Sequence, residues 1–186
     1  MKRLFDLCMA SVLLFVLFIP LLLIAICVRI TSSGPALYWS DRVGRNNEIF
    51  RMPKFRSMKI ETKPIPTHLM SNPENYLTLI GGFLRKSSLD ELPQLFSVLR
   101  GDLSFVGARP ALFNQQDLIE LRTERGIYKL FPGITGWAQV NGRDELSIPD
   151  KVKYDEEYLK RHTFLFDLKI LWLTVIKVFF GRGISH

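Results

Sequence analysis

The sequence predicts a small, helix-rich α+β domain of short elements, with an α/β arrangement as the alternative, attached to an N-terminal apolar segment. Short β-rich stretches are interleaved with helical patterns through the middle of the chain, and no internal repeat or low-complexity tract marks a second domain. The 186 residues suit one domain, and a mean hydropathy of +0.12 is too polar for a multispan membrane protein. The 14 Phe, 5 Tyr and 3 Trp exclude a disordered chain.

The N-terminal apolar segment is long enough to reach across a bilayer. No charged residue occurs in the 22 residues from Leu7 to Val28, which as a helix would extend roughly 33 Å, about the thickness of the hydrocarbon layer. We therefore expect this segment to contact a membrane. A cleaved signal peptide is disfavoured, because no small-x-small cleavage site follows the segment.

Composition leaves two interpretations of the apolar segment open, a simple span and a re-entrant helix. Lys2 and Arg3 precede the segment and the other 23 basic residues follow it from Arg29 onward, so both ends look cytoplasmic under the positive-inside rule. Pro20 lies within the segment, where it removes a backbone donor and clashes with the preceding turn. We expect a helix break at Ile19–Pro20, although many spanning helices tolerate a proline.

A β-hairpin is expected next along the chain. Residues 36–39 and 49–52 are rich in β-formers, and Gly44-Arg45-Asn46-Asn47 between them provides turn residues. Residues 61–76 contain three prolines and are expected to form an irregular excursion.

The most informative stretch covers residues 85–110. Ser88-Leu89-Asp90-Glu91 fits the capping-box pattern, and the apolar residues that follow at helical spacing predict a helix over about 88–99. Asp90 and Glu91 would then lie in the first turn, where acids complement the helix dipole. On a functional interpretation, the positive helix end keeps Asp90 ionised as a nucleophile toward phosphorus, while a hard cation such as Mg²⁺ neutralises the phosphate oxygens. Capping and catalysis both stay open at this point.

Three further helices are expected, at about 111–125, 150–162 and 164–181. The last is apolar at three- and four-residue spacing, but Asp167, Lys169 and Lys177 interrupt it and exclude a span. It is either an amphipathic helix lying on a lipid surface or a core helix.

The charge of the chain favours an anionic partner. The 25 Lys+Arg outnumber the 18 Asp+Glu, giving a net charge of +7, which suits phosphates, a lipid surface or nucleic acid. Nucleic-acid binding is not expected, because no recognised reading motif occurs. Both cysteines, Cys8 and Cys27, lie in the apolar segment, which excludes a disulfide framework and a cysteine-based metal site.

Basic side chains surround the two acids in sequence. Arginine grips phosphate bidentately and lysine acts as a point charge, although scattered basic residues are more often solvated surface. The basic residues concerned are Lys54, Arg56, Arg85, Lys86, Arg109 and Arg143. The turn-dense stretch 131–143, which includes Gln139, is either a strand-connecting loop or a loop whose glycines expose backbone donors to a phosphate or a base.

Taken together, these stretches resemble the bacterial sugar transferase family, the monotopic phosphoglycosyl transferases that start glycan assembly on polyprenol phosphate. The resemblance covers nearly the whole chain. It is carried by Lys-Arg-Leu-Phe-Asp before the proline-broken segment, and by the motifs at 54–58, 88–95, 101–107, 109–110, 132–136 and 167–170.

The resemblance implies a re-entrant membrane-anchoring helix over residues 1–30 and a cytoplasmic catalytic domain over residues 31–186 that includes the C-terminal amphipathic helix. It also implies a position on the cytoplasmic face of the bacterial inner membrane. The implied substrates are a UDP-sugar and undecaprenyl phosphate, and the implied cofactor is Mg²⁺.

By the same resemblance, Asp90 and Glu91 form the catalytic dyad and hold the Mg²⁺ ion. Asp90 attacks the β-phosphate of the UDP-sugar, UMP leaves, and polyprenol phosphate then takes the phosphosugar from the carboxylate. The expected substrate-binding residues are Lys54, Arg85, Arg109, Gln139 and Arg143.

Two positions depart from the family pattern. Ala108 stands where many members have proline, which leaves the orientation of the Arg109 side chain open. Asn114 stands where many members carry an acid, which leaves the acidic partner of Arg109 open. A homodimer is kept as a partner hypothesis. The rival function is a non-catalytic membrane adaptor that binds anionic lipid or pathway enzymes, and a lipid phosphate hydrolase with water as the acceptor is a third.

Overall fold

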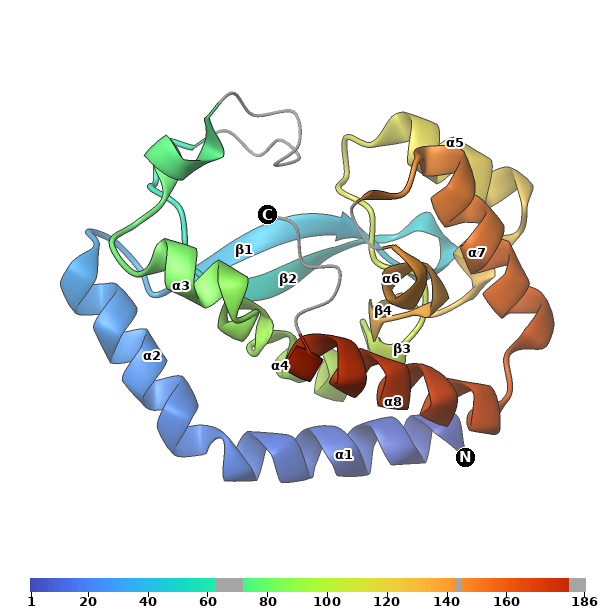
Figure 1. Cartoon of the computed structure of the whole chain (residues 1–186), viewed down its shortest axis with the longest axis horizontal. Coiled ribbons are helices and arrows are strands. Elements are labelled where there is room, and N and C mark those ends of the chain that lie inside the picture. The colour runs from blue at the N-terminus through green and yellow to red at the C-terminus, as the bar shows by residue number, and fades with distance from the viewer. Residues whose placement is uncertain (63–71, 143–144, 181–186) are drawn as a thin grey trace.

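The computed structural model describes residues 1–62, 72–142 and 145–180. Helices predominate, and the strands described form one antiparallel pair and one parallel pair. The bent helices α1 and α2 border the domain, α8 lies alongside α1, and the β1–β2 hairpin runs through the middle (Figure 1). The predicted α+β class is confirmed for this part of the chain.

The apolar segment forms two helices instead of one. α1 covers Lys2–Val16, α2 covers Phe18–Thr31, and the two are bent by 63° relative to each other. Pro20 lies in the first turn of α2, where its ring would clash with the carbonyl of Val16 in a continuous helix. The predicted break is confirmed, but it falls at Leu17, three residues before Pro20.

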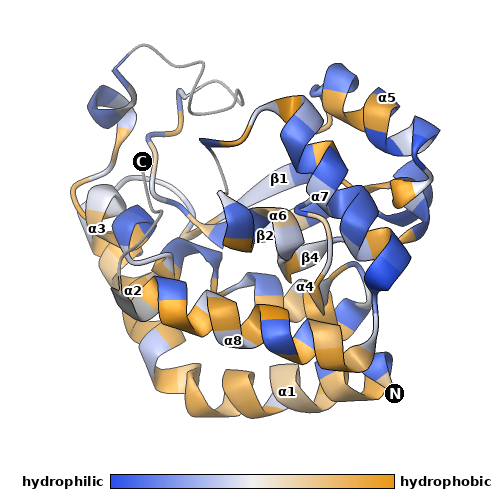
Figure 2. Cartoon of the chain, turned by 45° about the vertical axis from the view of Figure 1, so that its right-hand side comes forward, coloured by the Kyte–Doolittle hydropathy of each residue, from blue (hydrophilic) through white to orange (hydrophobic). Residues whose placement is uncertain are grey.

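Taken singly, none of the helices described is both long and apolar enough to cross a membrane. The bent pair together meets that requirement by length and composition alone. Apolar side chains on both sides of the bend are exposed, including Phe15, Phe18, Ile19 and Leu22. Hydropathy colouring shows apolar residues along α1, α2 and α8 (Figure 2).

The start of α1 is fastened to the domain by its two basic residues. The Lys2 ammonium pairs with Asp167 Oδ2 of α8 at 2.6 Å and donates to the Val106 carbonyl at 3.0 Å. Arg3 donates to the Val98 carbonyl at 2.7 Å. These residues, which the sequence suggested only as markers of membrane topology, therefore bind the folded domain directly.

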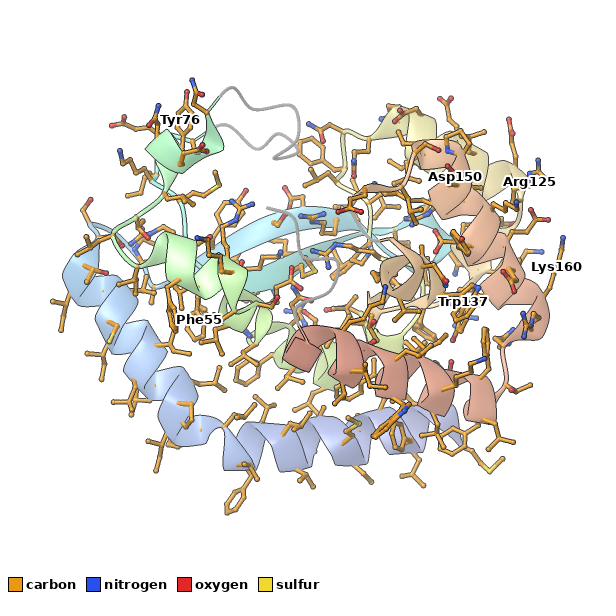
Figure 3. All side chains as sticks on the ribbon, in the orientation of Figure 1. Phe55, Tyr76, Arg125, Trp137, Asp150 and Lys160 are labelled. Atoms are coloured by element: carbon orange, nitrogen blue, oxygen red, sulfur yellow. The ribbon has the colours of Figure 1, made fainter. Side chains whose placement is uncertain are left out.

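The end of α2 packs against the same domain. Val28 is fully buried in a cluster with Phe55 of β2 and Leu84 of α3 (Gly81–Lys86), and Figure 3 labels Phe55 in this region. α1 shares the main core through Ala10, which is also fully buried. Both ends of the bent pair thus contact one globular body.

The predicted hairpin is confirmed and is longer than expected. β1 (Leu37–Val43) pairs antiparallel with β2 (Ile49–Phe55). The connection holds the 3₁₀ turn Arg45–Asn47, in which Asn46 and Asn47 have positive φ, a conformation that asparagine tolerates well. Lys54 lies near the end of β2, opposite Tyr38.

The helix predicted over 88–99 is split, and the capping-box prediction is wrong. Ser88 is left-handed with φ of 56°, and its side chain makes no capping hydrogen bond. Leu89–Glu91 form a 3₁₀ turn, and α4 covers Gln94–Arg100 after Pro93. Pro93 has no N–H with which to extend a helix from the preceding turn. The two acids therefore lie in a tight turn between α3 and α4.

The stretch 131–143 contains elements that the sequence did not reveal. β3 (Ser104–Val106) pairs in parallel with β4 (Gly133–Thr135), and α6 covers Trp137–Asn141. The Gly133 N–H donates to the Ala108 carbonyl at 2.9 Å, and a Cβ on Gly133 would lie 2.1 Å from the Gly107 nitrogen. Gly133 therefore permits close packing of two backbones, and the expectation of an exposed donor is wrong there.

The other helices agree in part with the predictions. α5 covers Gln116–Glu124 and begins later than expected, α7 covers Ile148–Arg161, and α8 covers Phe164–Phe180. Shorter 3₁₀ turns cover Pro73–Tyr76 and Ile127–Lys129. Of the predicted excursion at 61–76, residues 63–71 lie outside the described residues.

α8 packs into the core on one side only, and its contact with lipid stays a prediction. Phe166 and Ile170 are buried in the main core, and the Phe166 ring lies 5.0 Å from that of Trp137, which Figure 3 labels. Leu165 and Trp172 are exposed. One side of this helix therefore belongs to the core, while another presents apolar side chains outward.

Candidate active site

The two acids of the 3₁₀ turn lie below the surface. Asp90 is 8% exposed, and the Glu91 side chain is 15% exposed. Asp90 and Glu91 are adjacent in sequence, yet they have different surroundings, and their pKa values shift in opposite directions. A short turn between two helices thus presents two carboxylates that cannot behave alike.

Glu91 is held by two cations. Its Oε1 atom accepts from the Lys54 ammonium at 2.6 Å and from the Arg109 guanidinium at 2.7 Å, and Oε2 lies 3.4 Å from the other terminal nitrogen of Arg109. Burial alone would raise the pKa of Glu91, but the charges and hydrogen bonds of Arg109 and Lys54 hold that pKa well below its usual range. Glu91 is therefore a permanent anion at physiological pH.

The pKa of Asp90 shifts in the opposite direction. Burial raises the pKa of its carboxyl above the usual value, and the neighbouring Glu91 charge adds to that rise, whereas Lys54 and Arg85 oppose it. Among the described residues, none donates a hydrogen bond to the Asp90 carboxylate. Asp90 precedes α4 and does not lie in its first turn, so the helix end expected to favour its ionised form is not at this position, and burial is the largest influence on its pKa.

Lys54 and Arg109 are confirmed as neighbours of the dyad, and Arg85 contributes from α3. Burial lowers the pKa of Lys54, with the nearby Arg109 charge adding to the drop, and the Glu91 charge acts in the opposite direction. Arg85 exerts an attractive Coulomb interaction on Asp90 and donates to the Met58 sulfur at 3.2 Å. Three of the five predicted substrate-binding residues therefore gather around Asp90 and Glu91.

Among the residues described, no hydrogen bond or ion pair joins Gln139 to the dyad. Gln139 lies in α6, and its side-chain amide atoms are buried without a hydrogen-bond partner in the same part of the chain. Arg143 lies outside the described residues. Their assignment to substrate binding stays a prediction.

Arg42 is a neighbour of the site that the sequence did not indicate. It lies in β1, and burial and the Arg109 charge lower its pKa to about 10, against the attraction of Glu91. Its guanidinium donates to the Pro110 carbonyl at 3.2 Å. Nothing in the local pattern around Arg42 distinguishes it from a surface arginine, because its role depends on the pairing of β1 with a distant segment.

The two departures from the family pattern are also located. Ala108 is buried, and its carbonyl accepts from Gly133, so the backbone before Arg109 is fixed without a proline. Asn114 is exposed, and Glu91 supplies the carboxylate partner of Arg109. The backbone contacts around Arg109 and its ion pair with Glu91 therefore orient the Arg109 side chain.

The dyad fits a Mg²⁺ ion only if the substrate supplies most of its ligands. The described residues include no cluster of three or more acids, histidines or cysteines that could hold a metal. Glu91 is already paired with two cations, whereas Asp90 accepts no hydrogen bond from them. Mg²⁺ commonly takes one or two protein carboxylates and completes its shell with phosphate oxygens and water. This chemistry agrees with a metal that enters with a diphosphate.

Comparisons with known proteins cover nearly the whole chain. The sequence model of a family described as "Bacterial sugar transferase" matches residues 1–181. The chain is 42% identical over 188 residues to the "Uncharacterized sugar transferase EpsL" of Bacillus subtilis strain 168, an alignment that covers 100% of this chain and 91% of that protein.

Two further relatives carry descriptive names. The "UDP-glucose:undecaprenyl-phosphate glucose-1-phosphate transferase" of Escherichia coli K12 is 40% identical over 98% of this chain, which spans only 41% of that longer protein. The "Exopolysaccharide production protein ExoY" of Rhizobium meliloti strain 1021 is 36% identical over 98% of this chain and 87% of its own length.

Proposed function

The chain belongs to the bacterial sugar transferase family, and from that premise we propose that it is an enzyme that moves a sugar-1-phosphate from a UDP-sugar to undecaprenyl phosphate and releases UMP. The observation that carries this proposal is the pairing of a buried carboxyl group, Asp90, with a cation-clamped Glu91. Relatives named as undecaprenyl-phosphate sugar phosphotransferases support it. The product would be the lipid-linked first sugar of a polysaccharide.

In the first step, an ionised Asp90 oxygen attacks the β-phosphorus of the UDP-sugar. A bond forms between that oxygen and phosphorus, the bond from phosphorus to the bridging oxygen breaks, and UMP leaves with the bonding electrons. Arg109, Lys54 and Arg85 stabilise negative charge on the phosphate oxygens, which is the main demand of phosphoryl transfer. Glu91 holds Arg109 and Lys54 in place for this task.

In the second step, a phosphate oxygen of undecaprenyl phosphate attacks the same phosphorus. The bond between Asp90 and phosphorus breaks, so the carboxylate is regenerated and a sugar diphospholipid is released. Asp90 and Glu91 would hold Mg²⁺ together with the diphosphate, and the ion would supply additional neutralisation of phosphate charge.

We propose that residues 1–30 form a re-entrant anchor at the cytoplasmic face of the inner membrane. Lys2 at the start of α1 and Val28 near the end of α2 contact the same globular body. A segment with both ends on one body enters and leaves a bilayer on one side. The exposed apolar side chains at the bend supply the surface that lipid would cover.

The adaptor alternative is not favoured. It gives no reason for burying Asp90 beside a second carboxylate, because removing ionisable groups from water costs stability. The hydrolase alternative differs only in the acceptor. Product analysis separates the three, since they yield a sugar diphospholipid, no product, or free sugar phosphate.

The test is Asp90→Asn in the full-length protein in detergent, assayed by UMP release from a panel of UDP-sugars with undecaprenyl phosphate. Loss of the nucleophile should lower kcat by roughly 10⁴-fold, and rapid-quench mass spectrometry of the parent should detect a phosphosugar adduct on Asp90. Near-normal turnover of the variant, or a turning-over parent without the adduct, would contradict the proposal.

A stability measurement is the control for this variant. Burial raises the pKa of Asp90 in the folded protein above the value of 3.8 expected in the unfolded chain. Between these two pKa values, the unfolded chain has lost the Asp90 proton while the folded protein still holds it. Stability therefore falls across that interval and stays lower at neutral pH. Asp90→Asn should unfold no more easily than the parent at pH 7, so its inactivity would not reflect misfolding.

A further inference from the structure

The segment that carries Arg109 has no regular secondary structure, and its shape depends on donors from other elements. The carbonyls of successive residues accept hydrogen bonds from Gly133 N–H (Ala108, 2.9 Å), Arg122 (Arg109, 2.8 Å), Arg42 (Pro110, 3.2 Å) and Val43 N–H (Ala111, 3.0 Å). The position of the Arg109 backbone is therefore determined from outside the segment. Of these donors, the Arg122 guanidinium contacts Arg109 itself.

Arg122 is in turn held by a buried ion pair. It lies in α5, and its Nε and a terminal nitrogen donate to Asp155 Oδ2 of α7 at 3.0 Å and 2.6 Å. The Asp155 side chain is 1% exposed and that of Arg122 is 11% exposed. The remaining terminal nitrogen of Arg122 donates to the Arg109 carbonyl. The planar guanidinium thus faces a carboxylate on one edge and the active-site segment on another.

Packing between α5 and α7 does not require this ion pair. Leu118 of α5 and Val152 of α7 are buried in one apolar cluster with Ala108 and Ala111. A buried ion pair can often be replaced by apolar residues of similar volume without loss of stability, because removing two charges from water is costly. The cost of keeping Arg122 and Asp155 buried therefore points to a role beyond joining two helices.

We propose that Arg122 and Asp155 are positioning residues that fix the Arg109 guanidinium against Glu91 and the transferring phosphate. The proposal rests on the function proposed above. Arg122 restrains the Arg109 backbone, and Asp155 restrains Arg122. Misplacement of a catalytic group by about 1 Å can cost on the order of 100-fold in rate, so a hydrogen bond to the Arg109 peptide can govern turnover without touching substrate.

The main test compares two double variants. Arg122→Met/Asp155→Leu removes both buried charges together and leaves neither one unpaired. Its matched control is Arg125→Met/Glu156→Gln, which removes the exposed 3.3 Å ion pair between Glu156 of α7 and Arg125, the residue that follows α5. We expect the first variant to lose roughly 10- to 100-fold in kcat, and the control to keep the parental value.

A second readout does not need turnover. Loosening Arg109 weakens its hydrogen bonds to Glu91, so the guanidinium N–H signals of Arg109 should shift and exchange faster with solvent in the first variant only. They are followed by ¹⁵N NMR of labelled arginine side chains, with Arg109→Lys used to assign the signals. If the parent released no UMP from any donor, the proposed function would fail, while this measurement would still judge the positioning role.

A folded Arg122→Met/Asp155→Leu variant with parental kcat and unchanged Arg109 guanidinium signals would overturn the proposal. Should it not fold, Asp155→Asn keeps a hydrogen-bond acceptor for Arg122 and is judged by the same two readouts. Coupling gives a last check: after Arg109→Ala, the Arg122 and Asp155 changes should cause no further loss of kcat, and additive losses would contradict the proposal.

Discussion

The bent helix pair and the turn that holds the dyad contrast in what they bury. Along α1 and α2, Phe15 is 86% exposed and Phe18 is 65% exposed, so large apolar surface faces outward. In the turn, the ionisable groups Asp90 and Glu91 are enclosed and surrounded by cations. Exposed hydrocarbon is stable in an apolar surrounding, whereas buried charge is stable beside opposite charge. The residues proposed to contact the membrane therefore differ from those proposed to carry the reaction, and each set can be changed separately.

The largest effect is expected at the bend. Phe15→Ser/Phe18→Ser removes two apolar side chains worth about 1.5–3 kcal/mol each when buried, so partition into vesicles should weaken by about 3–6 kcal/mol. Cosedimentation with phospholipid vesicles measures it. The control is Ile49→Ser, an exposed apolar residue on the hairpin, which should bind like the parent. Equal loss in both variants would argue against the bend as the contact surface.

The attachment of α1 to the domain should have the next largest effect. Lys2→Ala leaves Asp167 buried with only the Tyr158 hydroxyl as a side-chain partner among the described residues, which should lower the free energy of unfolding by about 3 kcal/mol. Thermal unfolding in detergent measures the change. Lys2→Ala/Asp167→Asn removes the unpaired charge as well and should recover part of the loss. No recovery would show that the ion pair is not the cause.

The dyad predicts an asymmetric pH profile. The nucleophile must be ionised, and the pKa of Asp90 is raised, so kcat should fall on the acid side about tenfold per pH unit, beginning above the ordinary aspartate value of 3.8. Glu91 stays ionised throughout, because its pKa is depressed. A profile measured with saturating substrates tests this. An acid limb at or below the ordinary aspartate range would contradict the raised pKa.

The smallest effect is expected at Ser88, which lies two residues before Asp90. Its φ of 56° costs about 1–2 kcal/mol for a residue with a Cβ atom, while glycine loses about 0.5–1 kcal/mol more backbone entropy on folding. Ser88→Gly should therefore raise the free energy of unfolding by up to about 1.5 kcal/mol. Ser88→Val should lower it. Chemical denaturation of both variants decides whether strain is stored there.

Local patterns predicted the longer elements well. The hairpin, α7 and α8 were correctly placed because their hydrophobic periodicity and turn residues are contained within each segment. β3 and β4 were not predicted, because a strand of three residues is too short to show a hydrophobic periodicity. Their pairing also joins segments almost 30 residues apart in the sequence. The capping box failed because a matching local pattern did not reveal the left-handed conformation that Ser88 adopts.

The residues of the candidate site were also predicted only where a local motif marks them. Asp90, Glu91, Lys54 and Arg109 were predicted from motifs, and the last three are in contact. Arg42 and Arg122 were missed, because each acts through a backbone carbonyl that tertiary folding brings to it. The rise in the pKa of Asp90 was also not predicted, since the burial that causes it is a property of the folded domain.

The attachment of Lys2 sets an order of events during synthesis. Its partner Asp167 lies 165 residues later in the chain, and at about 5–20 residues per second the ribosome needs roughly 8–33 s to produce it. The apolar helices are complete once Thr31 has been added, so for most of that interval they exist without the contact that fastens their leading end. The attachment of α1 to the domain is therefore among the last contacts that the growing chain can form.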